Sequence, residues 1–354
     1  MEIFVAEEPR LYGIFNSNRF GDNLWGKNQF NSTFPVSLAC YMRDHKINPV
    51  YLVLDEELHI KATYTTSFNE IFNTTLSNEE IFFDFEGKYD PYQIYSHDDI
   101  QGIDLVVKSI QGEYLRPLEI KLTVIPDNST RLYEEADWGT EIVIRPATTK
   151  YCALGIADSC RDSFKDIREF FEPVCHGIQH WDSVYEIYAK MANIVSAIDT
   201  FQKSFYKRQK PLLMQPIWKT LGVSPMLADN SFDMFIWSDF AFSRLFLDSA
   251  LKCREDDITR PARSTARFAR FMYEVSSSGK SKINAIYTEM VFNKQTDKEF
   301  AVNGCVTRKY MNSERKTKPV LHKSVIKELI LGGGEKKLSP ERRFDQTIYF
   351  TFFD

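Results

Sequence analysis

Two segments rich in β-branched residues and leucine constrain the fold more than any other feature of this 354-residue sequence. The first reads IDLVVKSI from Ile103 and the second reads LRPLEIKLTVIP from Leu115, with a turn at Gln111-Gly112 between them. Such runs are typical of β-strands, and the short connection favours a hairpin. A third run, TEIVIRP at Thr140–Pro146, predicts another strand. We therefore expect a sheet that contains these strands.

Charged residues interrupt the first two runs at Asp104, Glu119 and Lys121. Side chains alternate between the two faces of a strand, so Glu119 and Lys121 are expected on the same face. The hairpin partner would bring Asp104 alongside them. Two carboxylates that converge on one open site suit a hard cation such as Mg²⁺, which prefers oxygen ligands and keeps several waters. The pattern predicts a magnesium site formed by Asp104 and Glu119, with Lys121 beside it.

A magnesium ion at such a site can polarise a phosphate and lower the pKa of a bound water. Lys121 could then position or deprotonate that water and offset charge in the transition state. The structural alternative is an exposed strand pair with ordinary salt bridges. Against it, the neighbouring strand positions are apolar, and charges in a buried sheet are costly unless they are paired or bind a metal. The residue types alone leave both interpretations open.

Helices are predicted both before and after these strands in the sequence. One helix is expected at Ser32–His45, followed by a strand at Pro49–Asp55. In the second half of the chain the apolar residues recur with a helical period of about 3.6. This period indicates helices at Trp181–Phe205 and Phe232–Leu251, and an arginine-bearing helix at Ile258–Val275. Two later runs, INAIYTEMVF and EFAVNGCV, predict a hairpin.

The net charge of −5 is unevenly distributed along the chain. Residues 252–354 carry 21 Lys and Arg against 13 Asp and Glu, which gives a net charge of +8. Residues 1–251 carry 23 against 36, which gives −13. A basic region on an acidic body suits a protein that meets a polyanion with one face, whereas a chance imbalance among solvated charges is the alternative.

Four arginines in the basic region recur at helical spacing: Arg260, Arg263, Arg267 and Arg270. Spacings of three and four residues place them on one face of the predicted helix. This stripe predicts DNA contacts, because guanidinium groups bind phosphates and can read guanine O6 and N7. A solvated face that pairs with the acidic residues at 255–257 is the alternative. Further candidates for phosphate contacts are Lys27, Asn28, Arg308 and Lys309.

Several other features point away from competing functions. The six cysteines lie far apart and the start of the sequence lacks a secretion signal, so we expect reduced thiols in a cytoplasmic protein. No run approaches the roughly 18 apolar residues of a membrane span. The spacing of His176 and His180 relative to the cysteines fits no closed zinc module. The tripeptide at 279–281 resembles the end of a phosphate-binding loop but lacks its first glycine, which favours a simple turn.

Three segments carry motifs that are more specific than the charged triad. They read IFNSNRFGDNLWGKNQFNSTFPVSLACYM from Ile14, GIDLVVKSIQGEYLRPLEIKLTVIPDNST from Gly102 and EIVIRPAT from Glu141. These segments resemble the HindVP family of type II restriction endonucleases, and the resemblance covers most of the chain. It implies a PD-(D/E)XK nuclease that cuts both DNA strands with Mg²⁺, as a homodimer on a palindromic, GRCGYC-like site. One departure is that Ile103 precedes Asp104 where the general motif has proline.

Together, the residues and the resemblance predict an α/β fold with a PD-(D/E)XK restriction-endonuclease-like core. A mixed central sheet flanked by helices is expected, with an added C-terminal DNA-recognition region. Residues 1–212 are assigned to the nuclease core with an N-terminal extension and residues 213–354 to the recognition region, with one interwoven domain as the alternative. The expected partners are double-stranded DNA, a second copy of the chain, and a DNA methyltransferase encoded nearby. Alternative functions are DNA repair, RNA processing, and DNA binding without catalysis.

Overall fold

The computed structural model describes residues 27–126, 141–220, 227–303, 306–307 and 310. The α-helices within these ranges are α1 (Lys27–Asp44), α2 (Phe68–Phe72), α3 (Pro146–Ser159), α4 (Phe164–Cys175), α5 (Val184–Phe205), α6 (Asp239–Leu247), α7 (Arg260–Ser278) and α8 (Ile283–Glu289). The strands are β1 (Val50–Leu54), β2 (Ile60–Thr63), β3 (Ile81–Gly87), β4 (Ile103–Ser109), β5 (Tyr114–Ile120), β6 (Thr123–Pro126), β7 (Glu141–Ile144), β8 (Pro211–Thr220), β9 (Leu227–Ser238) and β10 (Phe300–Asn303).

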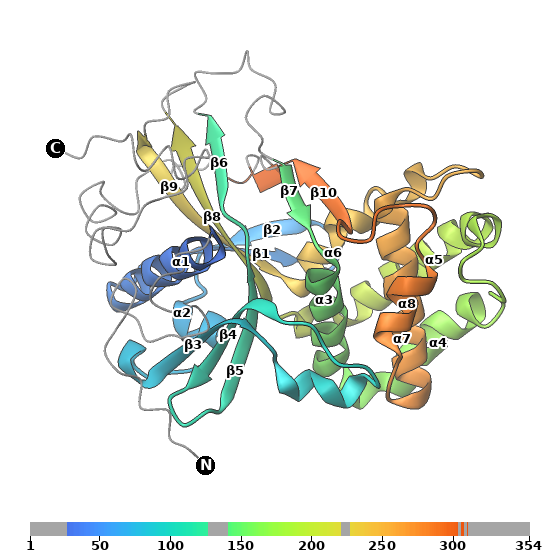
Figure 1. Cartoon of the computed structure of the whole chain (residues 1–354), viewed down its shortest axis with the longest axis horizontal. Helices are drawn as coiled ribbons and strands as arrows, with labels where there is room; N and C mark the ends of the chain where they lie inside the picture. Colours follow the sequence, from blue (N-terminus) through green and yellow to red (C-terminus); the bar gives the residue numbers. More distant parts are fainter. Residues whose placement is uncertain (1–26, 127–140, 221–226, 304–305, 308–309, 311–354) are drawn as a thin grey trace.

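A mixed sheet of eight strands lies at the centre of the described residues (Figure 1). Seven strands follow the order β2-β1-β9-β8-β5-β4-β3, and β6 pairs with β8. The pairs β1–β9, β5–β8 and β6–β8 are parallel, whereas the other pairs of this sheet are antiparallel. The predicted α/β class, a mixed central sheet flanked by helices, is confirmed.

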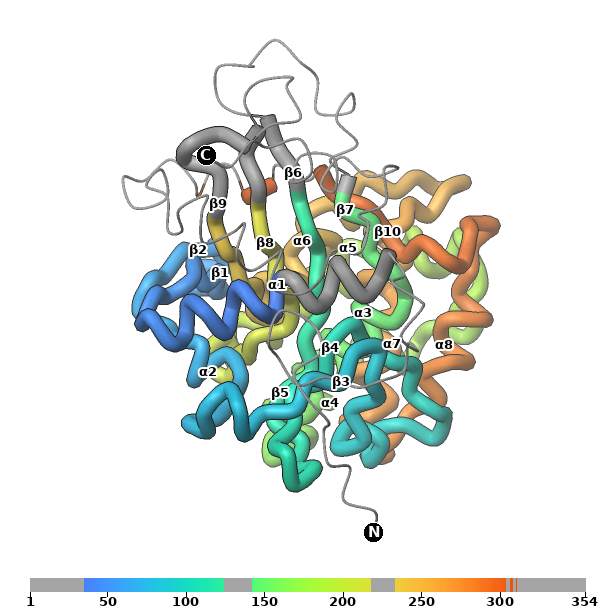
Figure 2. The backbone as a smooth tube through the Cα atoms, turned by 60° about the vertical axis from the view of Figure 1, so that its left-hand side comes forward, coloured from blue at the N-terminus to red at the C-terminus, as the bar shows by residue number. Residues whose placement is uncertain are grey.

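Helices cover both faces of this sheet. The helices α1 and α2 pack on one face, where Leu38 and Phe72 join Leu105 and Leu118 of the strands in one hydrophobic core. On the other face, Val106 and Leu213 join a larger core that includes residues of α3, α4, α5, α6 and α7. Figures 1 and 2 show the two groups of helices on either side of the strands. Because strand side chains alternate, Asp104 and Val106 share a face, so the predicted acidic residues lie on the α3 side of the sheet.

The helix α7 shows how local sequence sets the element boundaries. Thr259 precedes it, and the Thr259 side chain accepts a hydrogen bond from the backbone N–H of Ala262. Pro261 lies in the first turn, where its missing N–H has no cost. Gly279 ends the helix with φ of 80°, a conformation that glycine adopts without strain. Residues 279–281, for which a turn is predicted, thus contain the end of α7 at Gly279 and an isolated bridge from Ser281 to Ser96.

The helix predicted at Phe232–Leu251 is wrong in its first third. Strand β9 continues through Ser238, and α6 begins only at Asp239, with the Ser238 hydroxyl accepting from the backbone N–H of Ala241. The run Met234–Trp237 is buried in the middle of the sheet. A short strand buried on both faces has no alternating pattern, so its sequence resembles that of a buried helix.

The hairpin predicted within residues 283–306 is also wrong. Its first run forms α8, and the second contributes β10, which pairs antiparallel with β7 rather than with a sequence neighbour. The register joins Phe300 to Ile144, more than 150 residues away in the sequence. Local periodicity carries no information about such a distant partner.

The predicted regions 1–212 and 213–354 share one sheet. Strand β8 spans the proposed boundary, and both β8 and β9 lie between β1 and β5 in the strand order. The helix predicted at Trp181–Phe205 begins later than expected. The Ser183 side chain accepts a hydrogen bond from the backbone N–H of Glu186 and caps α5, so Trp181 lies outside that helix. None of the described helices has the length and apolar character needed to span a membrane.

Candidate active site

Antiparallel pairing of β4 with β5 brings the predicted catalytic residues together. The register pairs Leu105 with Leu118 and Val106 with Pro117, which sets Asp104 opposite Glu119 on the same face. Strand β5 ends at Ile120, and β6 resumes at Thr123 along the same neighbour, β8. The single strand predicted from Leu115 to Pro126 is therefore interrupted. Lys121 lies in this interruption, where its backbone N–H donates to Met214 at 2.9 Å.

The three side chains contact one another directly. The ammonium Nζ of Lys121 lies 2.5 Å from Oε1 of Glu119 and 3.5 Å from Oδ2 of Asp104. The backbone N–H of Ile120 donates to the same Oδ2 atom at 2.9 Å, which fixes the Asp104 carboxylate against β5. The side chain of Glu119 is 5% exposed, whereas those of Lys121 and Asp104 are 19% and 22% exposed. Solvent therefore reaches the cluster at Asp104 and Lys121 but hardly reaches Glu119.

The electrostatics of the cluster reflect two acids and one base in a partly buried place. Burial and the nearby charge of Asp104 raise the pKa of Glu119 to about 7, although Lys121 and the Thr148 hydroxyl oppose this rise. Burial lowers the pKa of Lys121, but the carboxylates of Glu119 and Asp104 outweigh that effect and raise the pKa above its usual value. Lys121 is therefore an ammonium ion here. A further positive charge would relieve the repulsion between the two carboxylates.

The residues present fit a hard divalent cation. Asp104 and Glu119 offer carboxylate oxygens on one face, and the described residues contain no group of three or more Asp, Glu, His or Cys that could form a full protein cage. Mg²⁺ commonly binds through one or two carboxylates and keeps several waters, whereas Zn²⁺ usually takes several nitrogen or sulfur ligands. The donor set therefore matches the expectation of Mg²⁺ better than a structural zinc site.

Thr148 was missed by sequence reasoning, and it lies beside the cluster. It belongs to the first turn of α3, its side chain is completely buried, and its hydroxyl lowers the pKa of the Glu119 carboxyl. The available signal was a pair of threonines, Thr148 and Thr149, that begins two residues after the third predicted strand. Threonine is common near helix starts for reasons of capping alone, so this pattern does not distinguish a site residue.

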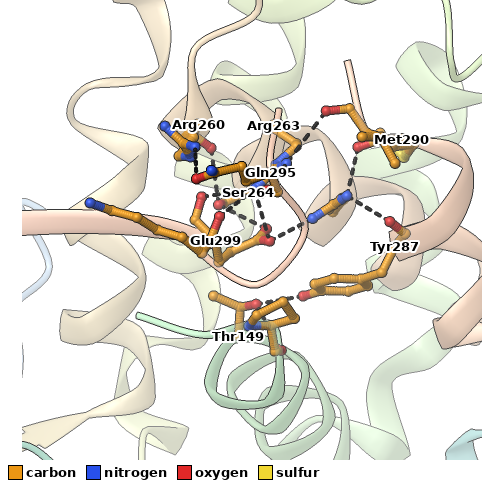
Figure 3. A network of polar contacts seen from close by, with 12 residues as sticks. Thr149, Arg260, Arg263, Ser264, Tyr287, Met290, Gln295 and Glu299 are labelled. Carbon is orange, nitrogen blue, oxygen red and sulfur yellow. Dashed lines mark hydrogen bonds and ion pairs between the residues drawn. The ribbon is translucent and has the colours of Figure 1, made fainter. Parts of the chain in front are cut away.

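The arginine stripe is not the exposed surface that its spacing predicts. The side chains of Arg263 and Arg267 are 0% and 1% exposed. Both reach Glu299, with Nη1 of Arg267 2.5 Å and Nη2 of Arg263 3.5 Å from its Oε2 atom. Arg263 also donates to backbone carbonyls between residues 291 and 299, and Arg267 donates to those of Tyr287 and Met290. Figure 3 shows this network around Glu299.

The guanidinium groups of Arg263 and Arg267 are thus enclosed by the protein and are not presented on the surface, where the predicted DNA contacts would require them. Arg270 pairs with Glu274 at 2.8 Å and Glu289 at 2.6 Å. Arg260 is partly exposed and makes one long hydrogen bond, 3.4 Å, to Gln295. The alternative partners proposed at residues 255–257 are not used by the stripe in the contacts described.

The remaining candidates are less informative. Lys27 and Asn28 begin α1, but the structure does not describe their side chains. Arg308 and Lys309 lie outside the described residues altogether. The five described cysteines are free thiols, as expected. His176 contacts the hydroxyl of Tyr273 at 3.4 Å, and the described histidines and cysteines form no metal cluster.

A mixed sheet flanked by helices, with two carboxylates and a lysine on one face, is consistent with the restriction-endonuclease class. The sequence profile described as HindVP restriction endonuclease matches residues 25–352, and this chain belongs to that family. The type II restriction enzyme HgiDI of Herpetosiphon aurantiacus is 38% identical over 347 residues, which cover 97% of this chain and 96% of the relative. The probable type II restriction enzyme HindVP of Haemophilus influenzae is 36% identical over 349 residues, with coverage of 98% and 95%. No solved structure matches the chain.

Proposed function

We propose that this restriction endonuclease hydrolyses phosphodiester bonds in both strands of double-stranded DNA, with Mg²⁺ as its cofactor and Asp104, Glu119 and Lys121 as its catalytic residues. The observation that carries the proposal is the contact of the Lys121 ammonium with both carboxylates on one partly open face of the sheet. Family membership and the names of the two relatives, both type II restriction enzymes, support the substrate class.

Asp104 and Glu119 are assigned to holding the cation. Bound there, Mg²⁺ would polarise the scissile phosphate and lower the pKa of a coordinated water. The hydrogen bond from the Ile120 N–H holds Asp104 in place, and burial behind Glu119 excludes bulk water from that side. Removal of water strengthens the electrostatic interactions within the site.

Lys121 is assigned to positioning the attacking water and offsetting charge. Because the two carboxylates raise the pKa of Lys121, its ammonium keeps its proton at neutral pH. A charged ammonium can donate hydrogen bonds and stabilise the negative charge that grows on the phosphate. The geometry therefore favours the electrostatic role over direct deprotonation of water by Lys121.

A short palindromic recognition site, GRCGYC-like by the family resemblance, is part of the same proposal. Two copies of the chain related by a twofold axis would present one catalytic centre to each strand of such a site. A cognate methyltransferase encoded nearby would protect the host DNA. Such an enzyme would act in the cytoplasm, where host DNA is present.

The test is digestion of a plasmid of known sequence with the purified protein in Mg²⁺, followed by mapping of the fragment ends. We expect discrete fragments in Mg²⁺, none in EDTA, and ends that all lie at one palindromic sequence. Cleavage of RNA or of damaged DNA in preference to the plasmid would instead support the repair or RNA-processing alternative. Specific binding of the plasmid with no cleavage in Mg²⁺ or Mn²⁺ would support a non-catalytic DNA-binding protein.

A further inference from the structure

The two strands on either side of Lys121 follow β8 in the same register. Glu119 of β5 pairs with Leu213, and Thr123 of β6 pairs with Ile217. Between these two pairs no residue is inserted or skipped on either side. The interruption between β5 and β6 is therefore not a change of register, and a missing hydrogen bond at the positions in between can account for it.

Pro216 of β8 supplies the physical reason for the interruption. In a parallel pair, a residue whose carbonyl accepts from one residue of the neighbouring strand donates its own N–H to the carbonyl two residues earlier in that strand. The carbonyl of Met214 accepts from the N–H of Lys121 at 2.9 Å. The next residue of β8 with the same orientation is Pro216, whose N–H would donate to the carbonyl of Lys121. Proline has no N–H, so β8 offers this carbonyl no donor.

A side-chain hydroxyl takes the place of the missing N–H. The Oγ1 atom of Thr123 lies 3.5 Å from the carbonyl oxygen of Lys121 and 3.0 Å from Nε2 of Gln215. Gln215 is completely buried, and its Oε1 atom accepts from Nε1 of Trp237 at 2.8 Å. Thr123 and Trp237 are 3% and 1% exposed. A row of three buried side chains from β9, β8 and β6, which lie side by side in Figure 1, thus ends at the backbone of Lys121.

The chemistry of the groups fixes the direction of each hydrogen bond in this row. The indole N–H of Trp237 can only donate, so the Gln215 oxygen faces it and the Gln215 NH₂ group faces Thr123. That NH₂ group can also only donate, so the Thr123 oxygen accepts from it. The Thr123 hydroxyl therefore keeps its own proton to donate to the Lys121 carbonyl. Hydrogen bonds that run in one direction strengthen one another, which supports the long last contact.

We propose that Gln215 is a positioning residue of the active site, which acts through Thr123 to hold the backbone of Lys121. This support replaces the ladder hydrogen bond that Pro216 cannot make. A fixed peptide group at Lys121 directs its long side chain toward the carboxylates, where Nζ lies 2.5 Å from Oε1 of Glu119. The proposal rests on the proposed function, in which Lys121 is a catalytic residue. It assigns to Gln215 no contact with DNA or with a cation.

Single-turnover cleavage by Gln215→Met and Thr123→Val tests the proposal. Each substitution nearly keeps the volume of the side chain and removes its polar group from the row. We expect both to slow cleavage about 10- to 100-fold with unchanged DNA affinity in Ca²⁺, because a misplacement of about 1 Å can cost about 10²-fold in rate. Thr123→Ser keeps the hydroxyl, leaves a small cavity and should stay within a few-fold of the parent. Packing alone predicts the opposite order of the two Thr123 variants, and that order would overturn the proposal.

Gln202→Met is the matched control. Gln202 is also completely buried, and its amide group makes hydrogen bonds to Ser243 at 2.6 Å and Arg244 at 3.2 Å, both in α6. We expect parental cleavage from this variant under conditions in which urea unfolding shows every variant to be folded. Equal losses of rate in Gln202→Met and Gln215→Met would reveal a general effect of buried glutamines and contradict the assignment.

The Lys121→Ala background shows whether Gln215 acts through Lys121. If it does, adding Gln215→Met should slow the residual cleavage by less than about twofold, because no ammonium remains to be positioned. A full 10- to 100-fold loss in that background would mean that Gln215 acts independently of Lys121, which is incompatible with the proposal.

Pro216→Ala tests the same link from β8. The substitution returns an N–H at the position from which the Lys121 carbonyl would accept. In the Thr123→Val background it should recover at least part of the lost cleavage rate. If it recovers none, the carbonyl of Lys121 is not the cause of the loss, and the proposal fails.

An NMR signal of Lys121 separates this proposal from the proposed function. With ¹³C at the ε position of lysine, the signal that is missing in Lys121→Ala belongs to Lys121. We expect one shifted signal in the parent and, in Gln215→Met and Thr123→Val, a signal near that of a freely rotating lysine. If the parent does not cut DNA, the proposed function fails, and a moved or unmoved signal still supports or overturns the role of Gln215. If the parent cuts DNA and both variants keep its rate, the Gln215 proposal alone fails.

Discussion

Two clusters of charged side chains in this protein balance their charges in different ways. In the proposed catalytic cluster of Asp104, Glu119 and Lys121, two carboxylates share one ammonium, and the three side chains are 5–22% exposed. In the buried cluster of Arg263, Arg267 and Glu299, two guanidinium groups share one carboxylate, and no side chain is more than 1% exposed. Each cluster has one charge in excess, negative in the first and positive in the second.

Backbone carbonyls distinguish the two. In the buried cluster, backbone carbonyl oxygens within residues 287–299 surround the excess positive charge. These hydrogen bonds join the two arginines of α7 to the chain that precedes β10. In the catalytic cluster, one backbone N–H reaches Asp104, and repulsion between the carboxylates helps to raise the pKa of Glu119 to about 7. A buried acid with a raised pKa next to a partly exposed charged group is typical of a functional site, whereas enclosed charges that pair with each other and with several backbone carbonyls are typical of a structural one.

The largest expected effect comes from removal of either catalytic carboxylate. Glu119→Gln and Asp104→Asn keep the shape of the side chain, but each removes an anionic ligand of the cation. The several kcal/mol by which a metal stabilises the transition state should then be lost, and cleavage should slow by about 10⁴-fold. Specific DNA binding in Ca²⁺ should remain or tighten, because the repulsion between carboxylate and phosphate falls. Plasmid cleavage in Mg²⁺ above a tenth of the parental rate would contradict the role of that carboxylate.

Removal of Lys121 should have the next largest effect. Lys121→Ala is expected to slow cleavage by roughly 10² to 10⁴, because its ammonium no longer offsets charge in the transition state. Cation binding should persist, since the two acids then lack their internal counter-ion. Lys108→Ala is the matched control: Lys108 pairs with Asp84 at 2.9 Å on β4 and β3, but it lies outside the triad. A loss of Ca²⁺ binding equal to that of Glu119→Gln would make Lys121 a structural residue.

The buried cluster is expected to act on stability. Glu299→Gln leaves two enclosed guanidinium groups without their carboxylate, which should lower the free energy of unfolding by about 3 to 5 kcal/mol. Glu289→Gln is the control, because it removes an ion pair with Arg270 in which the Glu289 side chain is 52% exposed. That loss should stay below about 1 kcal/mol. Urea unfolding of both variants measures the difference, and equal losses would show that burial does not separate the two kinds of pair.

The juxtaposition of Asp104, Glu119 and Lys121 could be predicted from the sequence because these charged residues interrupt runs of apolar strand residues. Period-two alternation fixes which side chains share a face, and a short hairpin fixes the register to within a residue or two. Asp104 and Glu119 therefore lie opposite each other, as expected. The parallel pairing of β5 and β6 with β8, a strand about 90 residues further along the chain, could not be predicted in the same way. That pairing leaves no local pattern.

The buried arginines could not be recognised for a similar reason. Helical spacing says that Arg263 and Arg267 share a face with Arg260 and Arg270, but it does not say what covers the face. Their carboxylate partner is Glu299, which lies 32 residues after Arg267. The covering segment includes the run that was predicted to be half of a hairpin. One wrong long-range pairing therefore led to a wrong environment for two of the four arginines.

The smallest expected effect concerns the two arginines at the ends of the stripe. Arg260 is partly exposed and has one long hydrogen bond, whereas Arg270 has two carboxylates and the Trp181 ring within 5.5 Å of its guanidinium. A phosphate can recruit a guanidinium more easily when the group has few partners to give up. We therefore expect Arg260→Ala to weaken DNA binding a few-fold and to reduce the log–log salt slope by about one unit.

Arg270→Ala should bind DNA with the parental slope, because its charge is already neutralised by Glu274 and Glu289. Binding isotherms on cognate and scrambled duplexes in Ca²⁺, at several salt concentrations, compare the two variants directly. A loss for Arg260→Ala that is equal on both duplexes identifies a phosphate contact, whereas a loss of about 1 to 3 kcal/mol on the cognate duplex alone identifies a base contact. If both variants keep the parental affinity and slope, the whole stripe belongs with the buried cluster as structure, and the DNA-reading surface must be formed by other elements.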